Sequence, residues 1–168
     1  KANVQKFVDA YNTLISFTNT QTKVTSVGDD KTPVTGALVG DSSVRSLLSA
    51  VRSEITTPGE GGSTYNTLAS LGITTDPKDG TLKINDDKLT KAVSTDFEGV
   101  AAYFTGDNGL ASRLTTRLKP YTDSAGILDQ RTDMLQKTIS SVDKQQKDLD
   151  TRIAALQDRL NKQFSAMD

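Results

Sequence analysis

Few residues of this chain have the types and the spacing that chemistry requires. The 168 residues include no cysteine and no histidine, which removes thiolate nucleophiles, disulfides, Cys/His zinc sites and the commonest proton-transfer side chain. Ser141 and Lys144 match the Ser-x-x-Lys spacing that supplies a nucleophile and its base in some hydrolases. That chemistry requires a desolvated lysine in a pocket, whereas both residues fall beside a helical seam. A chance match is the better explanation.

Two loops have partial resemblance to ligand-binding motifs. Residues 76–87 resemble a calcium loop with Gly80 at the turn, but only Asp79 and Asp86 fall on ligand positions and the bidentate glutamate is absent. A hairpin turn followed by a helix cap explains the same residues. The glycine-rich loop over 59–62 lacks the Gly-Lys-Ser/Thr ending that binds phosphate, so a linker is the better interpretation.

The adjacent pairs Asp29–Asp30 and Asp86–Asp87 could suggest general acid–base catalysis by carboxylates alone. Adjacent carboxylates on a loop or a cap point apart, and no apolar wall is evident that would raise a pKa. We therefore expect solvated charges at both places. The sequence predicts a protein that is not an enzyme and that has no catalytic residues, no metal site and no cofactor.

Charge and hydropathy limit the kinds of molecule that this chain can bind. The chain has 20 basic and 21 acidic residues, so it offers no broad attraction to nucleic acid or to an anionic membrane. No run of about 20 apolar residues is present to span a bilayer, and no signal peptide opens the chain. Because the first residue is Lys1 and not methionine, the sequence reads as a piece of a longer protein.

The order of apolar and helix-breaking residues predicts a mainly α fold, an elongated helical bundle or antiparallel coiled coil with a small β-hairpin, as a single domain over 1–168. A mean hydropathy of −0.43 indicates narrow seams between helices more than a thick core. Helix caps are expected at Asp41 or Ser42, at Asp86 and within 94–96. The expected elements are a helix over 2–22, a loop over 23–40, a helix over 41–55, a β-hairpin over 71–85, short helices over 86–120 that end near Pro120, and a long coiled-coil helix over 127–167.

The last helix gives the strongest pattern, because no glycine or proline interrupts it from Ile127 to Met167. At 1.5 Å per residue it would reach roughly 60 Å. Its apolar residues keep a seven-residue rhythm on a and d positions. They are Leu128, Leu135, Ile139, Val142, Leu149, Ile153, Leu156 and Leu160, with Met167 continuing the series.

Polar residues interrupt this seam at Thr132, Gln146 and Gln163, where they either fix register and oligomeric state or face water in an imperfect bundle. The first helix has a matching stripe of Val4, Phe7, Tyr11 and Leu14, followed by Thr18. We therefore expect the first and last helices to pack antiparallel in one stalk.

The chain resembles the bacterial flagellar hook-associated filament-capping family, in the helical leg region that follows that family's β-rich inserts. The matching stretches cover nearly the whole chain in order. They are residues 4–12 (VQKFVDAYN), 36–45 (GALVGDSSVR), 71–76 (LGITTD), 79–82 (DGTL), 87–89 (DKL), 126–128 (GIL), 131–133 (RTD) and 163–168 (QFSAMD).

The resemblance implies an extracellular protein, exported through the flagellar channel, that caps the filament tip, promotes flagellin polymerisation and prevents loss of monomers. Its implied partners are flagellin, further cap subunits in a homo-oligomeric ring (a pentamer or a hexamer), hook-associated junction proteins and an export chaperone. The family's N-terminal helical segment and inserts would lie upstream of this chain.

Two other classes remain as alternatives. A surface adhesin or carbohydrate-binding module would need aromatic stacking surfaces, whereas aromatic residues make up only 5% of the chain and tryptophan is absent. A hydrolase that uses carboxylates alone would need a convergent acidic pocket, for which the sequence shows no pattern.

Overall fold

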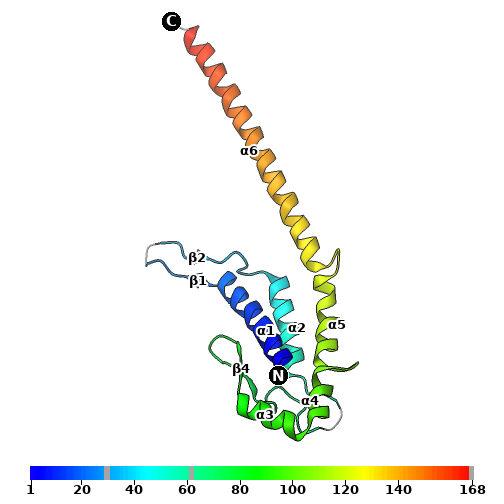
Figure 1. Cartoon of the computed structure of the whole chain (residues 1–168). Coiled ribbons are helices and arrows are strands. Elements are labelled where there is room, and N and C mark those ends of the chain that lie inside the picture. The colour runs from blue at the N-terminus through cyan, green and yellow to red at the C-terminus, as the bar shows by residue number, and fades with distance from the viewer. Residues whose placement is uncertain (29–30, 61–62, 167–168) are drawn as a thin grey trace. The chain divides into compact units, whose positions relative to one another are not determined.

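The computed structural model describes residues 1–28, 31–60 and 63–166 (Figure 1). The chain divides into two compact units, Lys1–Pro120 (unit 1) and Tyr121–Asp168 (unit 2), and each is described by itself. The single domain expected from the sequence stays a prediction. The acidic pair at 29–30, the glycines at 61–62 and the seam residue Met167 lie outside the described residues.

The fold is mainly helical, as predicted. The described elements in chain order are α1 (Ala2–Gln21), β1 (Val24–Thr25), β2 (Val34–Thr35), α2 (Ser42–Thr56), β3 (Ile73–Thr75), β4 (Leu82–Ile84), α3 (Asp86–Thr95), α4 (Phe97–Phe104), α5 (Leu110–Thr122) and α6 (Ile127–Ser165).

Two sequence predictions need correction in unit 1. The stretch 23–40 is not only a loop, because β1 and β2 pair antiparallel with Val24 opposite Thr35. Strands of two residues each are too short to show the alternation by which strands are recognised. The cap of α3 is Asn85 and not Asp86: the Asn85 Oδ1 accepts a hydrogen bond from the Lys88 amide at 3.0 Å. Asparagine and aspartate cap helices about equally well, so adjacent candidates are not separable by type.

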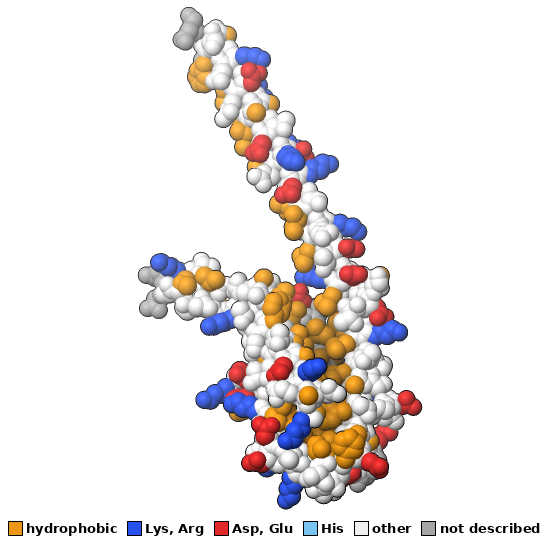
Figure 2. All heavy atoms as spheres, in the orientation of Figure 1, with side chains coloured by type: hydrophobic (Ala, Val, Ile, Leu, Met, Phe, Trp, Pro, Cys, Tyr) orange, Lys and Arg blue, Asp and Glu red, His pale blue; other side chains and the backbone are white. Residues whose placement is uncertain are grey.

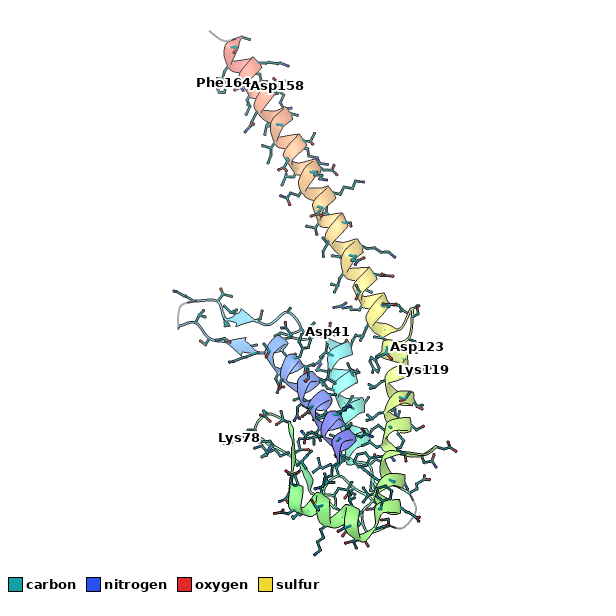
Figure 3. All side chains as sticks on the ribbon, in the orientation of Figure 1. Asp41, Lys78, Lys119, Asp123, Asp158 and Phe164 are labelled. Atoms are coloured by element: carbon teal, nitrogen blue, oxygen red, sulfur yellow. The ribbon has the colours of Figure 1, made fainter. Side chains whose placement is uncertain are left out.

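Other local predictions are confirmed. Asp41 caps α2 by accepting hydrogen bonds from the amides of Ser43 and Val44 (Figure 3). Asp96 caps α4 through the Gly99 amide at 2.8 Å and also accepts a hydrogen bond from the Ser63 hydroxyl. These hydrogen bonds hold the pKa of Asp96 below its usual value. β3 and β4 form the expected antiparallel hairpin, with Ile73 opposite Ile84.

The hydrophobic core belongs to unit 1 and draws on almost all its elements. α1 contacts β4, and α3 contacts α4. In Figure 1, α2 lies in the same unit, and α3 and α4 follow β4 along the chain. One buried cluster connects these elements with α5. The largest fully buried side chains in it are Val8, Ile15, Leu71, Ile73, Leu89 and Leu110.

A polar clamp fixes the hairpin to α1. The Asn12 side-chain amide donates to the Leu82 carbonyl at 2.9 Å, and its Oδ1 accepts from the Leu82 amide at 2.7 Å. The Asn12 amide thereby takes the place of a neighbouring strand along the edge of β4. Two further contacts, from the Tyr11 hydroxyl to the Gly80 carbonyl and from the Asn19 amide to the Asp79 carbonyl, extend the clamp along the turn.

The Asn12→Ala variant is expected to lower the free energy of unfolding of unit 1 by about 2 kcal/mol, because the partly buried amide and carbonyl of Leu82 both lose their partner. Urea unfolding followed by tyrosine fluorescence measures this, since three of the four tyrosines lie in unit 1. Asn19→Ala is the control: it removes one exposed hydrogen bond and should cost less than about 0.5 kcal/mol. Equal effects of the two variants would contradict the clamp.

Candidate assembly interface

The main candidate site is the apolar edge of α6. This helix runs for 39 residues, and its start is organised locally. The Asp129 carboxylate accepts from the Ala125 amide at 3.0 Å, and the Gln130 side chain donates to the Ala125 carbonyl at 2.8 Å. An acidic residue in the first turn also stabilises a helix through its dipole. Near the other end, Lys162 pairs with Asp158 at 2.7 Å, one turn away.

No described residue of α6 is buried. The seven seam residues assigned to this helix in the sequence, from Leu135 to Leu160, have exposed fractions between 41% and 60%. In Figure 2, hydrophobic side chains follow one edge of α6, with charged side chains away from that edge. The exposed apolar residues of α6 are Ile127, Leu128, Met134, Leu135, Ile139, Val142, Leu149, Ile153, Leu156, Leu160 and Phe164.

An edge of this kind is typical of an interaction surface. Single exposed apolar residues are ordinary, but a contiguous strip marks a site of association. The a and d rhythm gives the strip the form of a coiled-coil seam, which is stable only when a second helix covers it. We call the a and d residues from Leu128 to Gln163 the α6 seam.

The apolar stripe of α1, which we expect to pack against α6, lies in unit 1. Val4 and Tyr11 are buried there, and Phe7 and Leu14 pack partly buried against the same core. The Phe7 ring makes an edge contact with Phe104 of α4, with ring centroids 6.3 Å apart. The stripe of α1 thus already has partners from its own unit. Antiparallel packing of α1 on α6 stays a prediction.

The residues considered for catalysis that the structure describes are all exposed. Ser141 and Lys144 both lie exposed on α6, and the Ser141 hydroxyl accepts a hydrogen bond from the Gln145 side chain. Asp86 and Asp87 occupy the exposed first turn of α3. Within the described ranges, no group of three acidic, histidine or cysteine side chains is placed to hold a metal ion.

The carboxylates of the β3–β4 turn serve the turn itself. Asp76 pairs with Lys83 at 2.6 Å and accepts from the Lys78 amide, and Asp79 accepts from both the amide and the hydroxyl of Thr81. These hydrogen bonds hold the pKa of Asp76 and of Asp79 below the usual value, and the same ion pair raises the pKa of Lys83. Both carboxylates are therefore engaged within the hairpin turn.

Sequence reasoning missed a buried ion cluster in unit 1. Glu54 of α2 is buried, and its two oxygens accept from Arg113 at 3.1 Å and from Arg117 at 2.8 Å. The Arg113 guanidinium also donates to the carbonyls of Asn108 and Thr57. One signal could have indicated it: Glu54 falls one turn after Val51 on the apolar face of α2, where an unpaired acid would be unstable.

Unit 1 also has an apolar groove of about 330 Å³, which no sequence pattern predicted. Phe7, Phe97 and Phe104 line it together with Val93 and Leu114. Phe97 is the most exposed of these side chains. Apolar side chains dominate its lining, whereas a sugar-binding site orients its ligand with several converging polar groups.

None of the helices that the structure describes has both the length and the apolar character needed to cross a membrane.

Comparison with known proteins confirms the resemblance stated from the sequence. The family described as "Flagellar hook-associated protein 2 C-terminus" matches residues 1–168. The chain is 62% identical to the B-type flagellar hook-associated protein 2 of Pseudomonas aeruginosa over 167 residues, and 56% identical to the A-type protein of that species over 168 residues. These alignments cover 99% and 100% of the chain but only 35% of each relative.

A solved structure agrees with this assignment. The crystal structure of the D1-D2-D3 domains of the flagellar cap protein FliD from Escherichia coli superposes with a TM-score of 0.66 at 36% identity. The superposition covers 77% of this chain and 34% of that one. The family is structural and not enzymatic, in keeping with a surface built for packing. The chain therefore belongs to the flagellar hook-associated protein 2 family, and it matches the C-terminal region of the proteins in that family.

Proposed function

We propose that this chain is the helical leg of a filament cap, which acts outside the cell at the tip of the bacterial flagellum. There the full-length protein promotes flagellin polymerisation and prevents the loss of monomers. Its partners are flagellin and further cap subunits in a homo-oligomeric ring, a pentamer or a hexamer, with hook-associated junction proteins and an export chaperone as transient partners.

One observation carries the proposal: α6 presents an apolar seam that nothing in its own unit covers, in a chain that belongs to a flagellar cap family. A rod with one apolar edge and charged remaining faces is suited to assembly, because each seam residue gains stability only when another helix covers it. The chain spans about a third of the length of the curated relatives it matches. Capping, flagellin polymerisation and ring formation are therefore proposed for the full-length protein and not for this chain alone.

The test uses the full-length protein in a flagellated bacterium that lacks its own cap gene. The Leu149→Lys/Leu156→Lys double variant should fail to restore filaments, and flagellin should accumulate in the medium. The reason is that two lysines in a covered seam would each cost several kcal/mol, roughly. Filament length by electron microscopy and flagellin in the supernatant measure the effect.

The matched control is Thr151→Lys/Ala155→Lys, which adds the same two charges to exposed positions outside the seam. It should support filament growth as the unchanged protein does. Detection of the double seam variant in the medium separates failed capping from failed export. Normal filaments from the seam variant would show that the seam is not needed, and unchanged protein that never restores filaments would contradict the cap function itself.

A further inference from the structure

Two neighbouring residues of unit 1, Asn108 and Gly109, have the types needed to react with each other. They form the single Asn-Gly sequence of the chain. The backbone nitrogen that follows an asparagine can attack the side-chain carbon Cγ. Glycine permits this attack best, because it has no Cβ to obstruct it and its backbone is the most adaptable. Because the reaction is intramolecular, its rate depends on whether the fold lets these two atoms meet.

The fold leaves Asn108 where the two atoms can meet. Asn108 is exposed and lies in the connection between α4 and α5, outside any helix or strand (Figure 1). The Gly109 amide donates to the Gly106 carbonyl at 3.2 Å, which is at the long end of the normal range. Gly106 has a φ of +91° and open space around it. The turn therefore restrains the reacting nitrogen only weakly.

The structure also requires glycine at position 109. A Cβ added to Gly109 would lie 2.3 Å from the carbonyl oxygen of Thr105, at the end of α4. Gly109 is buried, and the next residue, Leu110, begins α5 and is 1% exposed. The reactive sequence is thus tied to the close packing by which α5 starts.

Asn108 also connects this turn with other parts of unit 1. Its side-chain amide donates to the Glu60 carboxylate at 2.7 Å, and its backbone carbonyl accepts from Arg113 at 2.8 Å. Arg113 is the arginine that pairs with the buried Glu54. The contact with Glu60 is exposed, so water can replace it at little cost and the side chain can turn toward the Gly109 nitrogen.

We propose that Asn108 deamidates spontaneously in the folded chain and that isoaspartate at this position loosens the start of α5. The Gly109 nitrogen forms a bond to Cγ of Asn108, the Cγ–Nδ2 bond breaks, and the displaced amide group takes the proton of the Gly109 nitrogen and leaves as ammonia. Water then opens the succinimide ring. Breakage of the new N–Cγ bond gives aspartate, whereas breakage of the original backbone N–C bond gives isoaspartate.

Both products change the surroundings of Asn108. A carboxylate replaces the amide donor and faces the carboxylate of Glu60, so an attractive contact becomes a repulsive one. Isoaspartate also inserts one carbon into the backbone directly before α5. Gly109 packs too closely on Thr105 to absorb that carbon, so the displacement passes to the buried Leu110. The modification needs only the folded chain and water, so it goes beyond the proposed cap function and does not rest on it.

Mass spectrometry of the folded 168-residue chain tests the site of modification. After incubation in mildly alkaline buffer, the tryptic peptide 92–113 should contain both products. Conversion at Asn108 should be at least tenfold faster, roughly, than at Asn85 and Asn161, which are exposed but are followed by larger residues. Digestion of chain that was not incubated gives the background.

The synthetic peptide 92–113 gives the rate without the fold. A folded chain that keeps Asn108 intact while this peptide is converted would overturn the proposal, because the fold would then protect the site. Conversion in the folded chain that is no faster at Asn108 than at Asn161 would overturn it as well.

Urea unfolding followed by tyrosine fluorescence tests the effect on α5. Ion exchange separates the modified chains, since each carries an additional negative charge. Isoaspartate at position 108 should raise the equilibrium constant of unfolding by about tenfold, as forced packing in a core does. The Asn108→Asp variant, which has the new charge without the extra backbone carbon, should raise it by less than about threefold.

The Asn108→Gln variant is the matched control, because it keeps an amide but its longer side chain forms the corresponding ring far more slowly. Its stability should not change during the same incubation. An equal loss of stability in this variant would assign the loss to another residue. An isoaspartate form as stable as the unmodified chain would overturn the effect on α5.

Discussion

Replacing Arg113 by methionine is expected to lower the free energy of unfolding of unit 1 by about 3 kcal/mol, the typical effect of removing one partner from a buried ion pair. Glu54 would keep only Arg117, whose side chain is 65% exposed, while its own side chain is 8% exposed. The carbonyls of Asn108 and Thr57 would lose a charged donor as well. Urea unfolding followed by tyrosine fluorescence measures the change.

Two further variants make this result specific. Arg117→Met removes the exposed partner only, so it should cost less than about 1 kcal/mol. The double variant Glu54→Met/Arg113→Met should recover most of the stability lost by Arg113→Met, because replacing a buried ion pair by apolar side chains of similar volume is often neutral. An Arg113→Met variant as stable as the unchanged protein would show that Glu54 does not depend on this arginine.

The Gly72→Ala variant is expected to cost about 3 kcal/mol, from two separate causes. The backbone of Gly72 has a φ of +82°, which side-chain-bearing residues rarely adopt, and an added Cβ would lie 2.6 Å from the Cβ of Lys88. Gly72 enters β3 at this point, and its carbonyl accepts the Asn85 amide that closes the hairpin. Because Asn85 caps α3, moving α3 away from Gly72 would stretch that hydrogen bond.

Gly40→Ala separates the two causes. Gly40 has nearly the same φ, +81°, but an added Cβ would meet no atom within 4 Å. It should therefore cost only the backbone strain, about 1 kcal/mol. The difference between the two variants in the free energy of unfolding, measured by chemical denaturation, is the cost of the close approach of the added Cβ to Lys88 of α3. Equal losses of stability would mean that this approach contributes nothing.

Features set by interactions between near neighbours in the chain could be predicted. The caps Asp41 and Asp96 act on amides two or three residues away. The β3–β4 turn likewise depends on contacts within a few residues. The end of α5 shows the limit of such rules: the helix continues to Thr122 although it contains Pro120, since a proline disfavours the helical conformation of the preceding residue without excluding it.

The stabilising polar contacts of unit 1 could not be predicted, because their partners are far apart in the chain. Glu54 and Arg113 are 59 residues apart, and Asn12 and Leu82 are 70 apart. Asparagine in a helix and glutamate on an apolar face are each consistent with several partners. Only the packing of α1, α2 and α5 around the hairpin decides which donor meets which acceptor.

The sequence by itself determined the rod of α6 and its seam, because a helix without glycine or proline fixes the face of each residue by its 3.6-residue period alone. It also carried enough matching residues to identify the family. The tertiary structure decided the partners of the α1 stripe, which pack in the core of unit 1, and the burial of Glu54 between two arginines. Periodicity states which side of a helix is apolar, whereas the surface that covers it depends on how distant segments pack.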